Sequence, residues 1–253
     1  MVMKKINILG TNISIIKDYE EAFINLKSIT ATQNYITVNN AHTVVEAVRN
    51  KNYRDALNNS YLALPDGKPL SIVAKLKGEK SISRIFGPTF MEKTLEWSQN
   101  NEVKHFFFGS SEETIQKMIA NISSKYPNSK VAGYFSPPYK NEFIEEENNF
   151  FIKLMNDSGA DLFWIGLGAP KQELWMYENY KKLNHGIMIG IGAGFDYLAG
   201  KTRHAPKWMK DFSLEWLYRL IQEPRRLWKR YLVTNTLFIW YVLLELICLR
   251  KFD

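Results

Sequence analysis

The sequence predicts an α/β fold: a Rossmann-like, mostly parallel sheet with helices on both faces, followed by a C-terminal helical appendage that associates with a membrane. Strand-like and helix-like segments alternate with short connections, which is typical of a parallel sheet. Residues 103–108 and 161–166 are largely continuous apolar runs, as expected for strands buried on both sides. We find no internal repeat or domain break before about residue 195, and therefore expect an α/β domain at 1–195 and the appendage at 196–253.

Apolar runs that end at Gly, Pro, Asn or Asp predict the strands. In chain order we place them at residues 5–16 (a strand or hairpin), 35–38, 61–64, 103–108, 130–135, 161–166 and 186–191. Pro65 and Gly67 terminate the third of these, and Ser136-Pro-Pro138 follows the fifth. All but the first are short, which suits a compact parallel sheet.

Helical spacing of apolar residues predicts the intervening helices. We place them at residues 18–26, 41–58, 70–77, 88–99, 111–125, 141–156 and 170–183. The Asp18…Glu21 and Ser110…Glu113 spacings fit caps for the first and fifth helices. Pro69 suits the first turn of the third helix, which begins at about residue 68.

The composition is that of a globular protein with an uneven charge. Its single cysteine, Cys248, excludes an internal disulfide and fits a reducing compartment, and the N-terminal apolar run is too short for a secretory signal. We therefore expect a cytoplasmic protein. The net charge is +7, and residues 201–253 alone carry 11 Lys/Arg against 5 Asp/Glu. A basic tail on a neutral body indicates an anionic partner: a membrane surface, a phosphate-bearing ligand or nucleic acid.

The stretch from Tyr61 to Leu70 carries the strongest catalytic candidate. Asp66 follows a short apolar strand, at the rim where open α/β sheets bind ligands. A carboxylate there can accept a proton from an attacking hydroxyl, an effect worth roughly 10²- to 10⁴-fold in rate. The alternative is an Asp that caps the following helix.

Other strand ends also carry small or polar residues. Thr37 and Asn39 close one strand, and Gly109, Gly168 and Gly192 follow three others. Glycines there let backbone N–H groups approach a phosphate, although ordinary tight turns also use them. No glycine run matches G-x-G-x-x-G with its downstream acid, so the pattern argues only weakly for a nicotinamide cofactor.

Metal ligands have no recognisable pattern in this sequence. No Asp-x-Asp occurs, and the four histidines are scattered, without ligand spacing. We therefore expect no metal, and cations must meet the charge of any bound diphosphate. Arg84 is one candidate and the tail arginines are others, unless they form ordinary surface ion pairs.

The tail has two predicted parts. Residues 214–231 mix aromatic residues with arginines at helical spacing, interrupted at Pro224, and residues 232–249 form a mainly apolar helix. Thr234, Tyr241, Glu245 and Cys248 fall on one narrow stripe of this helix.

Eighteen residues is the lower limit for spanning a bilayer, and Asn235 and Glu245 make spanning costly. The apolar helix could lie in the membrane interface, or it could be an ordinary core or dimerisation helix.

Several motifs together resemble the WecG/TagA/CpsF glycosyltransferases over most of the chain. They are Thr37-Val-Asn39, Pro65-Asp66-Gly67, Arg84-Ile-Phe-Gly87-Pro-Thr89, Gly168-Ala-Pro-Lys-Gln172-Glu-Leu-Trp175, Gly192-Ala-Gly-Phe-Asp196-Tyr-Leu-Ala-Gly200, Arg203-His-Ala-Pro206 and Leu214-Glu-Trp-Leu-Tyr-Arg219-Leu-Ile-Gln-Glu-Pro224. The resemblance implies metal-independent, inverting transfer of N-acetylmannosamine or a related hexose. The sugar would pass from a UDP-sugar to an undecaprenyl-diphosphate-linked acceptor in the synthesis of teichoic acid or another surface polysaccharide. The protein would then be peripheral, at the cytoplasmic face of the inner membrane.

The resemblance also implies roles for individual residues. Asp66 would be the general base, with Arg84 near the donor. Residues implied to bind substrate are Thr37, Asn39, Gly109, Gly168, Gln172, Gly192, Asp196, Arg203, Arg219, Arg226, Lys229 and Arg230. The apolar segment after Tyr231 departs from many members of the family.

Two other classes of protein stay open on the sequence. The glycine-rich strand ends would suit a dinucleotide-dependent oxidoreductase, which would bind NAD or NADP. The basic tail would suit a non-enzymatic membrane- or nucleic-acid-binding module, whose DNA affinity would fall steeply with salt. The transferase reading predicts no nucleic-acid partner, and it leaves homo-oligomer formation open.

Overall fold

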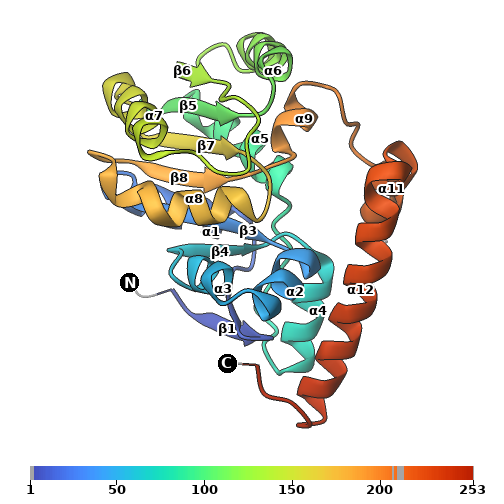
Figure 1. The fold of residues 1–253 in the computed structure, drawn as a ribbon. Helices are drawn as coiled ribbons and strands as arrows, with labels where there is room; N and C mark the ends of the chain where they lie inside the picture. Colours follow the sequence, from blue (N-terminus) through green and yellow to red (C-terminus); the bar gives the residue numbers. More distant parts are fainter. Residues whose placement is uncertain (1–2, 207, 210–213, 253) are drawn as a thin grey trace.

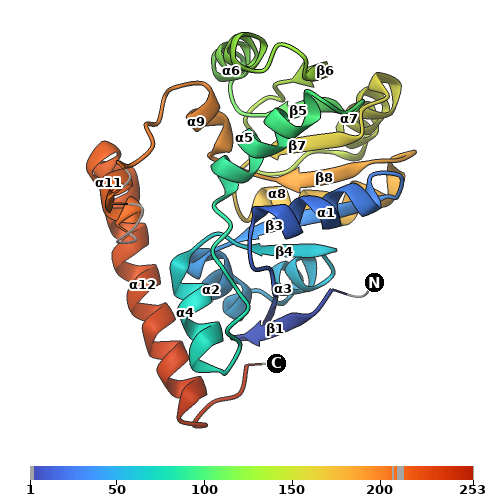
Figure 2. The same ribbon diagram turned by 180° about the vertical axis from the view of Figure 1, so that it is seen from behind.

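The centre of the molecule is a six-stranded parallel sheet (Figures 1 and 2). A computed structural model describes residues 3–206, 208–209 and 214–252, without the side chains of Arg226 and Arg230. The sheet has the order β4-β3-β8-β7-β5-β6, and its hydrogen-bonded neighbours all run parallel. Its strands are β3 (Asn34–Asn39), β4 (Leu62–Pro65), β5 (Lys104–Gly109), β6 (Lys130–Phe135), β7 (Leu162–Gly166) and β8 (Ile187–Gly190). The mostly parallel α/β sheet is therefore confirmed, although its strand order is not the 3-2-1-4-5-6 order of dinucleotide-binding domains.

A separate N-terminal hairpin lies beside β4. Its strands β1 (Lys5–Ile8) and β2 (Thr11–Ser14) pair antiparallel, which confirms the predicted hairpin. Leu9 and Gly10 make the turn with positive φ angles of 52° and 79°. The hydroxyl of Ser14 accepts a hydrogen bond from the Ala63 N–H at 2.9 Å, which joins the hairpin to the edge strand of the main sheet.

The helices of the α/β body follow the predicted order. They are α1 (Tyr19–Ile29), α2 (Ala41–Arg49), α3 (Lys51–Asn58), α4 (Lys68–Leu76), α5 (Gly87–Ser98), α6 (Glu112–Lys125), α7 (Glu145–Ser158), α8 (Lys171–Asn179) with the 3-10 turn Tyr180–Lys182, and α9 (Gly194–Leu198). The predicted cap of α1 is present, because the Asp18 carboxylate accepts the Glu21 N–H at 2.8 Å. Helix α9 was not predicted, and α1 ends at Ile29 and not at residue 26. Further differences at α2 and α3, α6, α7 and α8 have local causes.

The predicted helix at 41–58 is two helices, α2 and α3. The chain leaves α2 at Asn50, whose backbone is extended and whose side chain accepts the Tyr53 N–H at the start of α3. Asn is favoured at such a cap, because its short side chain can accept a backbone N–H of the first helical turn. Helix α6 is capped by Ser111 and not by the predicted Ser110. The backbone of Ser111 is extended and its hydroxyl accepts the Thr114 N–H, whereas Ser110 has a positive φ of 61°.

The other two differences are at α7 and α8. The first begins at Glu145 and not at 141, because the Glu147 carboxylate reaches back to the Ile144 N–H at 3.1 Å. The second ends at Asn179, after which the predicted stretch to 183 continues as a 3-10 turn.

Helices cover both faces of the sheet because successive strand residues point to opposite sides. On one face, Ile36 and Phe107 pack in a core with residues of α1, α5, α6 and α9. On the other, Tyr35 and Phe108 pack with residues of α7 and α8. The division predicted at residue 195 stays a prediction, and Phe195 belongs to the first of these cores.

The tail forms α11 (Glu215–Gln222) and α12 (Pro224–Leu246), and Figure 1 shows α12 alongside α2 and α4. The break at Pro224 is confirmed. The predicted helix at 232–249 is instead the later part of α12, which ends at Leu246 and continues from the basic segment without interruption. Within the described residues, no helix is both long and apolar enough to span a membrane.

The predicted polar stripe of α12 faces the body, except for Cys248, which lies beyond the end of the helix and is exposed. Phe238 and Val242 are buried on the same side. The Glu245 carboxylate pairs with Lys77 at 2.8 Å and accepts the Leu9 N–H at 3.3 Å, and the Thr234 hydroxyl lies 3.4 Å from a ring nitrogen of His42. Its apolar face points outward. Exposed large side chains on it are Trp228, Leu232, Val233, Ile239, Trp240, Leu243 and Leu246.

Candidate active site

Backbone pairing places Asp66 at the carboxyl edge of the sheet. Asn39 is opposite Pro65 in the β3–β4 register, and its carbonyl accepts the Asp66 N–H at 2.8 Å. A side chain on Gly87 would lie 3.1 Å from Val38 of β3 and 3.2 Å from Ile191, which follows β8. The ends of β3, β4 and β8 therefore converge on the turn that starts α5.

The Asp66 carboxylate does not cap α4. The N-cap of α4 is Gly67, which makes no side-chain bond, whereas the Asp66 carboxylate accepts the Gly87 N–H at 3.1 Å, at the start of α5. The capping alternative is therefore wrong for the helix that follows Asp66. Burial raises the pKa of the Asp66 carboxyl, and this rise is opposed by Arg84, the Gly87 N–H, Arg219 and Asn40 in that order.

Arg84 is held on three sides beside Asp66. Its Nε donates to the Asp66 carbonyl, and its terminal nitrogen pairs with the Glu215 carboxylate of α11. Its guanidinium carbon lies 4.7 Å from the centre of the Phe86 ring, a cation–π contact. The structure therefore joins the predicted base, the predicted donor-side cation and the tail.

Arg219 is the tail arginine whose charge reaches Asp66. It lowers the pKa of the Asp66 carboxyl, although less than Arg84 does, and its Nε lies 3.9 Å from the Glu223 carboxylate. Tyr197 of α9 lies in the same field: burial raises the pKa of Tyr197 to about 12, and the charges of Arg219 and Asp66 act on it in opposite directions. Two cations and a carboxyl group with a raised pKa are thus gathered at one place.

Thr37 and Asn39 are fully buried beneath this edge. Thr37 donates to the Ser60 hydroxyl at 3.2 Å and accepts the Asn39 amide at 2.9 Å, and the Asn39 carbonyl oxygen accepts the Thr43 hydroxyl at 3.5 Å. In this conformation the two predicted pocket side chains bond to each other and to the body. They form the floor of the site and stiffen the end of β3.

Gln172 lies between the ends of β7 and β8. Its carbonyl oxygen accepts the Gly168 N–H at 3.2 Å, and its amide donates to Glu173 at 2.6 Å. A side chain on Gly192, which has a φ of 48°, would lie 3.4 Å from the Gln172 oxygen. The structure thus brings the predicted residues Gly168, Gln172 and Gly192 together.

The remaining predicted residues either have a structural role or are exposed. Gly109 has a φ of 124°, and any side chain there would meet the Gly166 backbone at 2.5 Å, so the two strands require glycine at this point. The Asp196 carbonyl accepts the Lys201 and Thr202 N–H groups at the end of α9. Arg203 and Lys229 are exposed, and the side chains of Arg226 and Arg230 lie outside the described set.

Reasoning from sequence missed three residues of the site. The Tyr19 hydroxyl accepts the Phe86 N–H at 3.0 Å, and burial raises the pKa of that hydroxyl. Tyr197 and Glu215 contact the charged cluster as described above. Glu215 and Tyr197 had a readable signal, because Glu215 lies one helical turn before Arg219 in the tail motif and Tyr197 directly follows Asp196 in another motif, whereas Tyr19 had none.

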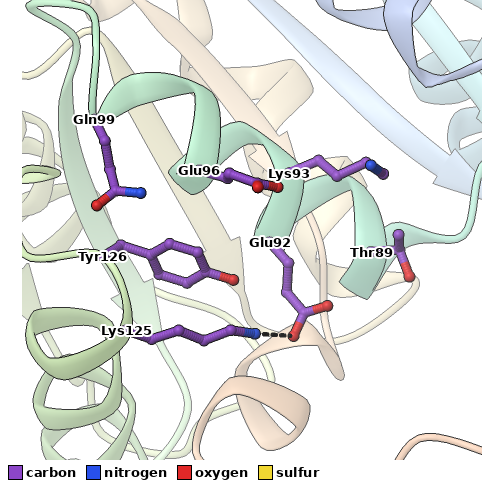
Figure 3. Close-up of a pocket in the computed structure, with 7 residues that line it drawn as sticks. All are labelled: Thr89, Glu92, Lys93, Glu96, Gln99, Lys125 and Tyr126. Carbon is purple, nitrogen blue, oxygen red and sulfur yellow. Dashed lines mark hydrogen bonds and ion pairs between the residues drawn. The ribbon is translucent and has the colours of Figure 1, made fainter.

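An open cavity of about 380 Å³ lies between α5 and the end of α6 (Figure 3). Glu92 crosses it toward Lys125, whose ammonium group lies 3.4 Å away, and Thr89 marks the end nearest Tyr19. Because the cavity is lined mainly by charged side chains of α5 and α6, and because Asp66 and Arg84 do not line it, we do not assign it to the reaction.

The described residues include no group of three or more His, Cys, Asp or Glu side chains that could hold a metal ion. His204 lies 3.6 Å from Glu92 and contacts the rings of Tyr197 and Phe86, so its surroundings are aromatic and acidic. Metal independence stays a prediction, and in the described site Arg84 and Arg219 are the cations whose charges lower the pKa of Asp66.

The parallel α/β sheet, with an acid and two arginines at its carboxyl edge, places the protein among the α/β proteins that bind their ligands at the ends of the strands. The family model described as the glycosyl transferase WecG/TagA/CpsF family matches residues 6–251. The chain therefore belongs to the WecG/TagA/CpsF family of glycosyl transferases. This excludes the oxidoreductase and the non-enzymatic module as its class.

Relatives of known name carry a common description. The chain is 31% identical to an N-acetylglucosaminyldiphosphoundecaprenol N-acetyl-beta-D-mannosaminyltransferase of Bacillus subtilis (strain 168), over 88% of this chain and 84% of the relative. Proteins of the same name are 28% identical in Bacillus spizizenii, over 78% and 74%, and 24% identical in Staphylococcus aureus (strain MW2), over 89% and 86%.

Proposed function

We propose that the protein transfers N-acetylmannosamine or a related hexose from a UDP-sugar to an N-acetylglucosaminyl-diphospho-undecaprenol acceptor, with inversion. The names of the relatives support the transferred sugar and the acceptor. Such a lipid-linked disaccharide would be an intermediate in the synthesis of teichoic acid or another surface polysaccharide.

The observation that carries this proposal is the surroundings of Asp66. A carboxyl whose pKa is raised by burial is a stronger base than an exposed one, and general bases work best when their pKa approaches the working pH. It sits beside two arginines that can balance the charge of a diphosphate.

In the proposed step the acceptor hydroxyl attacks the anomeric carbon of the donor sugar. Asp66 takes the hydroxyl proton as the new C–O bond forms and the bond to UDP breaks on the opposite side. One displacement of this kind inverts the anomeric centre. Arg84 and Arg219 stabilise the charge that develops on the departing diphosphate, so the step needs no metal.

The tail suits a peripheral position on an anionic membrane. The outward face of α12 carries exposed basic side chains, among them Arg225 and Lys229, followed by exposed apolar ones such as Trp240 and Leu243. A basic, apolar helix face binds the interface by burying apolar area and by attracting anionic lipid. We propose that α12 lies along the cytoplasmic leaflet and presents the site to the lipid-linked acceptor.

The test is transfer by the purified full chain. UDP-N-acetylmannosamine and a short-chain N-acetylglucosaminyl-diphospho-lipid are supplied with EDTA, and the β-linked disaccharide is measured by mass spectrometry and NMR. A panel of other UDP-hexoses identifies the donor. An α-linked product, or activity that EDTA abolishes and Mg²⁺ or Mn²⁺ restores, would refute the mechanism.

A further inference from the structure

One face of α11 carries three polar side chains that point toward the body. Glu215, Arg219 and Gln222 are spaced i, i+4 and i+7, so they share a face of the helix. Glu215 pairs with Arg84 at one end. At the other end the Gln222 amide accepts the Arg203 N–H at 2.9 Å and donates to the Arg203 carbonyl at 3.2 Å.

The rest of α11 is mainly apolar. Trp216 and Ile221 are 44% and 67% exposed, and the Trp216 ring packs edge-on against Tyr231 of α12, at 6.0 Å between ring centres, and not against the sheet. By contrast, the side chains of Arg84 and Glu215 are only 23% and 11% exposed. A pair shielded to this extent is screened less by water and salt than a surface pair. The polar contacts therefore determine how α11 sits.

Arg219 lies between these two points of attachment, one turn after Glu215. Its long side chain can reach Asp66 only if the helix backbone is held close to the end of β4. Arg84 contacts both the Asp66 carbonyl and the Glu215 carboxylate, which places the start of α11 at that edge in this structure, and the charge of Arg219 acts on both Asp66 and Tyr197. The two attachments bracket the arginine.

We propose that Glu215 and Gln222 are positioning residues, and that their contacts with Arg84 and Arg203 form a latch that holds Arg219 over Asp66. The function of the latch rests on the proposed role of Arg219 in transfer, whereas its effect on α11 does not. Arg84 thus has two roles: it lies beside Asp66 in the site, and it forms the ion pair that attaches the tail.

The latch is tested first without any activity measurement. Glu215→Gln and Gln222→Ala are compared with Glu102→Gln, which alters an exposed ion pair with Lys130 far from α11. Hydrogen exchange of the α11 amides is followed in the unliganded full chain by mass spectrometry. We expect each latch variant to accelerate exchange about tenfold, since each removes contacts of ordinary hydrogen-bond strength or more, and we expect Glu102→Gln to have no effect. Exchange equal to that of the control in both latch variants would overturn the latch.

The second test is a double-mutant cycle on transfer. Gln222→Ala, which touches the site only through the backbone of Arg203, should lower kcat about tenfold with little change in the donor KM. In an Arg219→Gln background the same substitution should have no further effect, because its target is already lost. Additive losses, or full activity of Gln222→Ala despite faster exchange, would refute positioning. A wild type without transfer would refute the proposed function, and the exchange result would still decide the latch.

Discussion

Asp66 is subject to opposing influences that leave its carboxyl with a raised pKa. Burial favours the neutral form, and Arg84, the Gly87 N–H and Arg219 restore part of the stability of the anion. A carboxylate paired more strongly would be a weak base, and one buried without cations would stay protonated. With Asn40, these neighbours come from three separate segments of the chain, and together they leave the residue between the two extremes.

Asp66→Asn should lower kcat by roughly 10²- to 10⁴-fold, because the amide keeps the shape and cannot accept the proton. It should also raise the thermal midpoint at pH 7. An acid with a raised pKa in the folded state destabilises that state once the pH passes the ordinary value of about 3.9, and Asn removes this effect. Calorimetry at pH 7 and at pH 3.5 checks the sign, since the gain should vanish at the lower pH. Transfer within tenfold of wild type would exclude Asp66 as the base.

The pH dependence of kcat/KM should report the same group. We expect an acid limb above pH 3.9, because the reaction needs the ionised form of a carboxyl with a raised pKa. Arg84→Gln removes the largest influence that lowers this pKa, so its acid limb should move to higher pH, in addition to any loss of rate. An acid limb at the same pH in both proteins would contradict the assignment of the limb to Asp66.

Among the elements, α12 carries large apolar side chains on both sides. Phe238 and Val242 are buried in a core with residues of α2 and α4, Glu245 on the same side contacts Lys77 and Leu9, and other large apolar side chains face outward. Glu245 would be costly in a membrane-spanning helix, and here it is satisfied by the body instead. The polar stripe therefore helps to attach α12 to the body, and we call it the docking strip.

Glu245→Gln should consequently destabilise the protein by about 1.5–3 kcal/mol, the usual contribution of a hydrogen bond to a charged group. Urea unfolding measures this change in the free energy of unfolding. Glu102→Gln is again the matched control, since its carboxylate also pairs with a lysine at 2.8 Å but is 92% exposed. Equal effects of the two substitutions would mean that the docking strip contributes no more than a surface pair.

The strands and most helices were predictable because their signals are local. The apolar run at β7 and the Asp18 cap are read from a few neighbouring residues. The division of 41–58 was missed, because a single residue makes it. Asn50 both ends α2 and caps α3, so no loop separates the two helices in the sequence.

The site was predictable only in part. Asp66 and Arg84 were named, as were the glycines around Gln172, because each occupies a recognisable strand end or family motif. The contact of Arg84 with Glu215 joins positions 131 residues apart, and no local pattern contains it. The same holds for Tyr19, whose hydroxyl meets a backbone N–H 67 residues later. Folding creates such contacts, so they appear only in three dimensions.

At the scale of the whole molecule, the tail joins two surfaces. Its α11 reaches the charged cluster at the sheet edge, and α12 extends from there along α2 and α4 (Figure 1). Most of the excess positive charge lies in the same segment. A membrane against the outward face of α12 would therefore lie next to the edge that carries Asp66, where a lipid-linked substrate must arrive.

Replacing Ile239, Trp240 and Leu243 together by Ser should lower sedimentation of the full chain with anionic phosphatidylglycerol vesicles at least about tenfold. Each of these side chains is about half exposed or more, and each would bury apolar area in the interface. The control replaces three large apolar residues elsewhere that are more exposed still, Ile24, Tyr139 and Ile144, and should bind as wild type does. Binding of both proteins should weaken with salt, because the basic residues supply the rest of the attraction. Equal sedimentation of the two triple variants would place the membrane contact elsewhere, since an unselective loss or no loss at all is incompatible with a bilayer lying on α12.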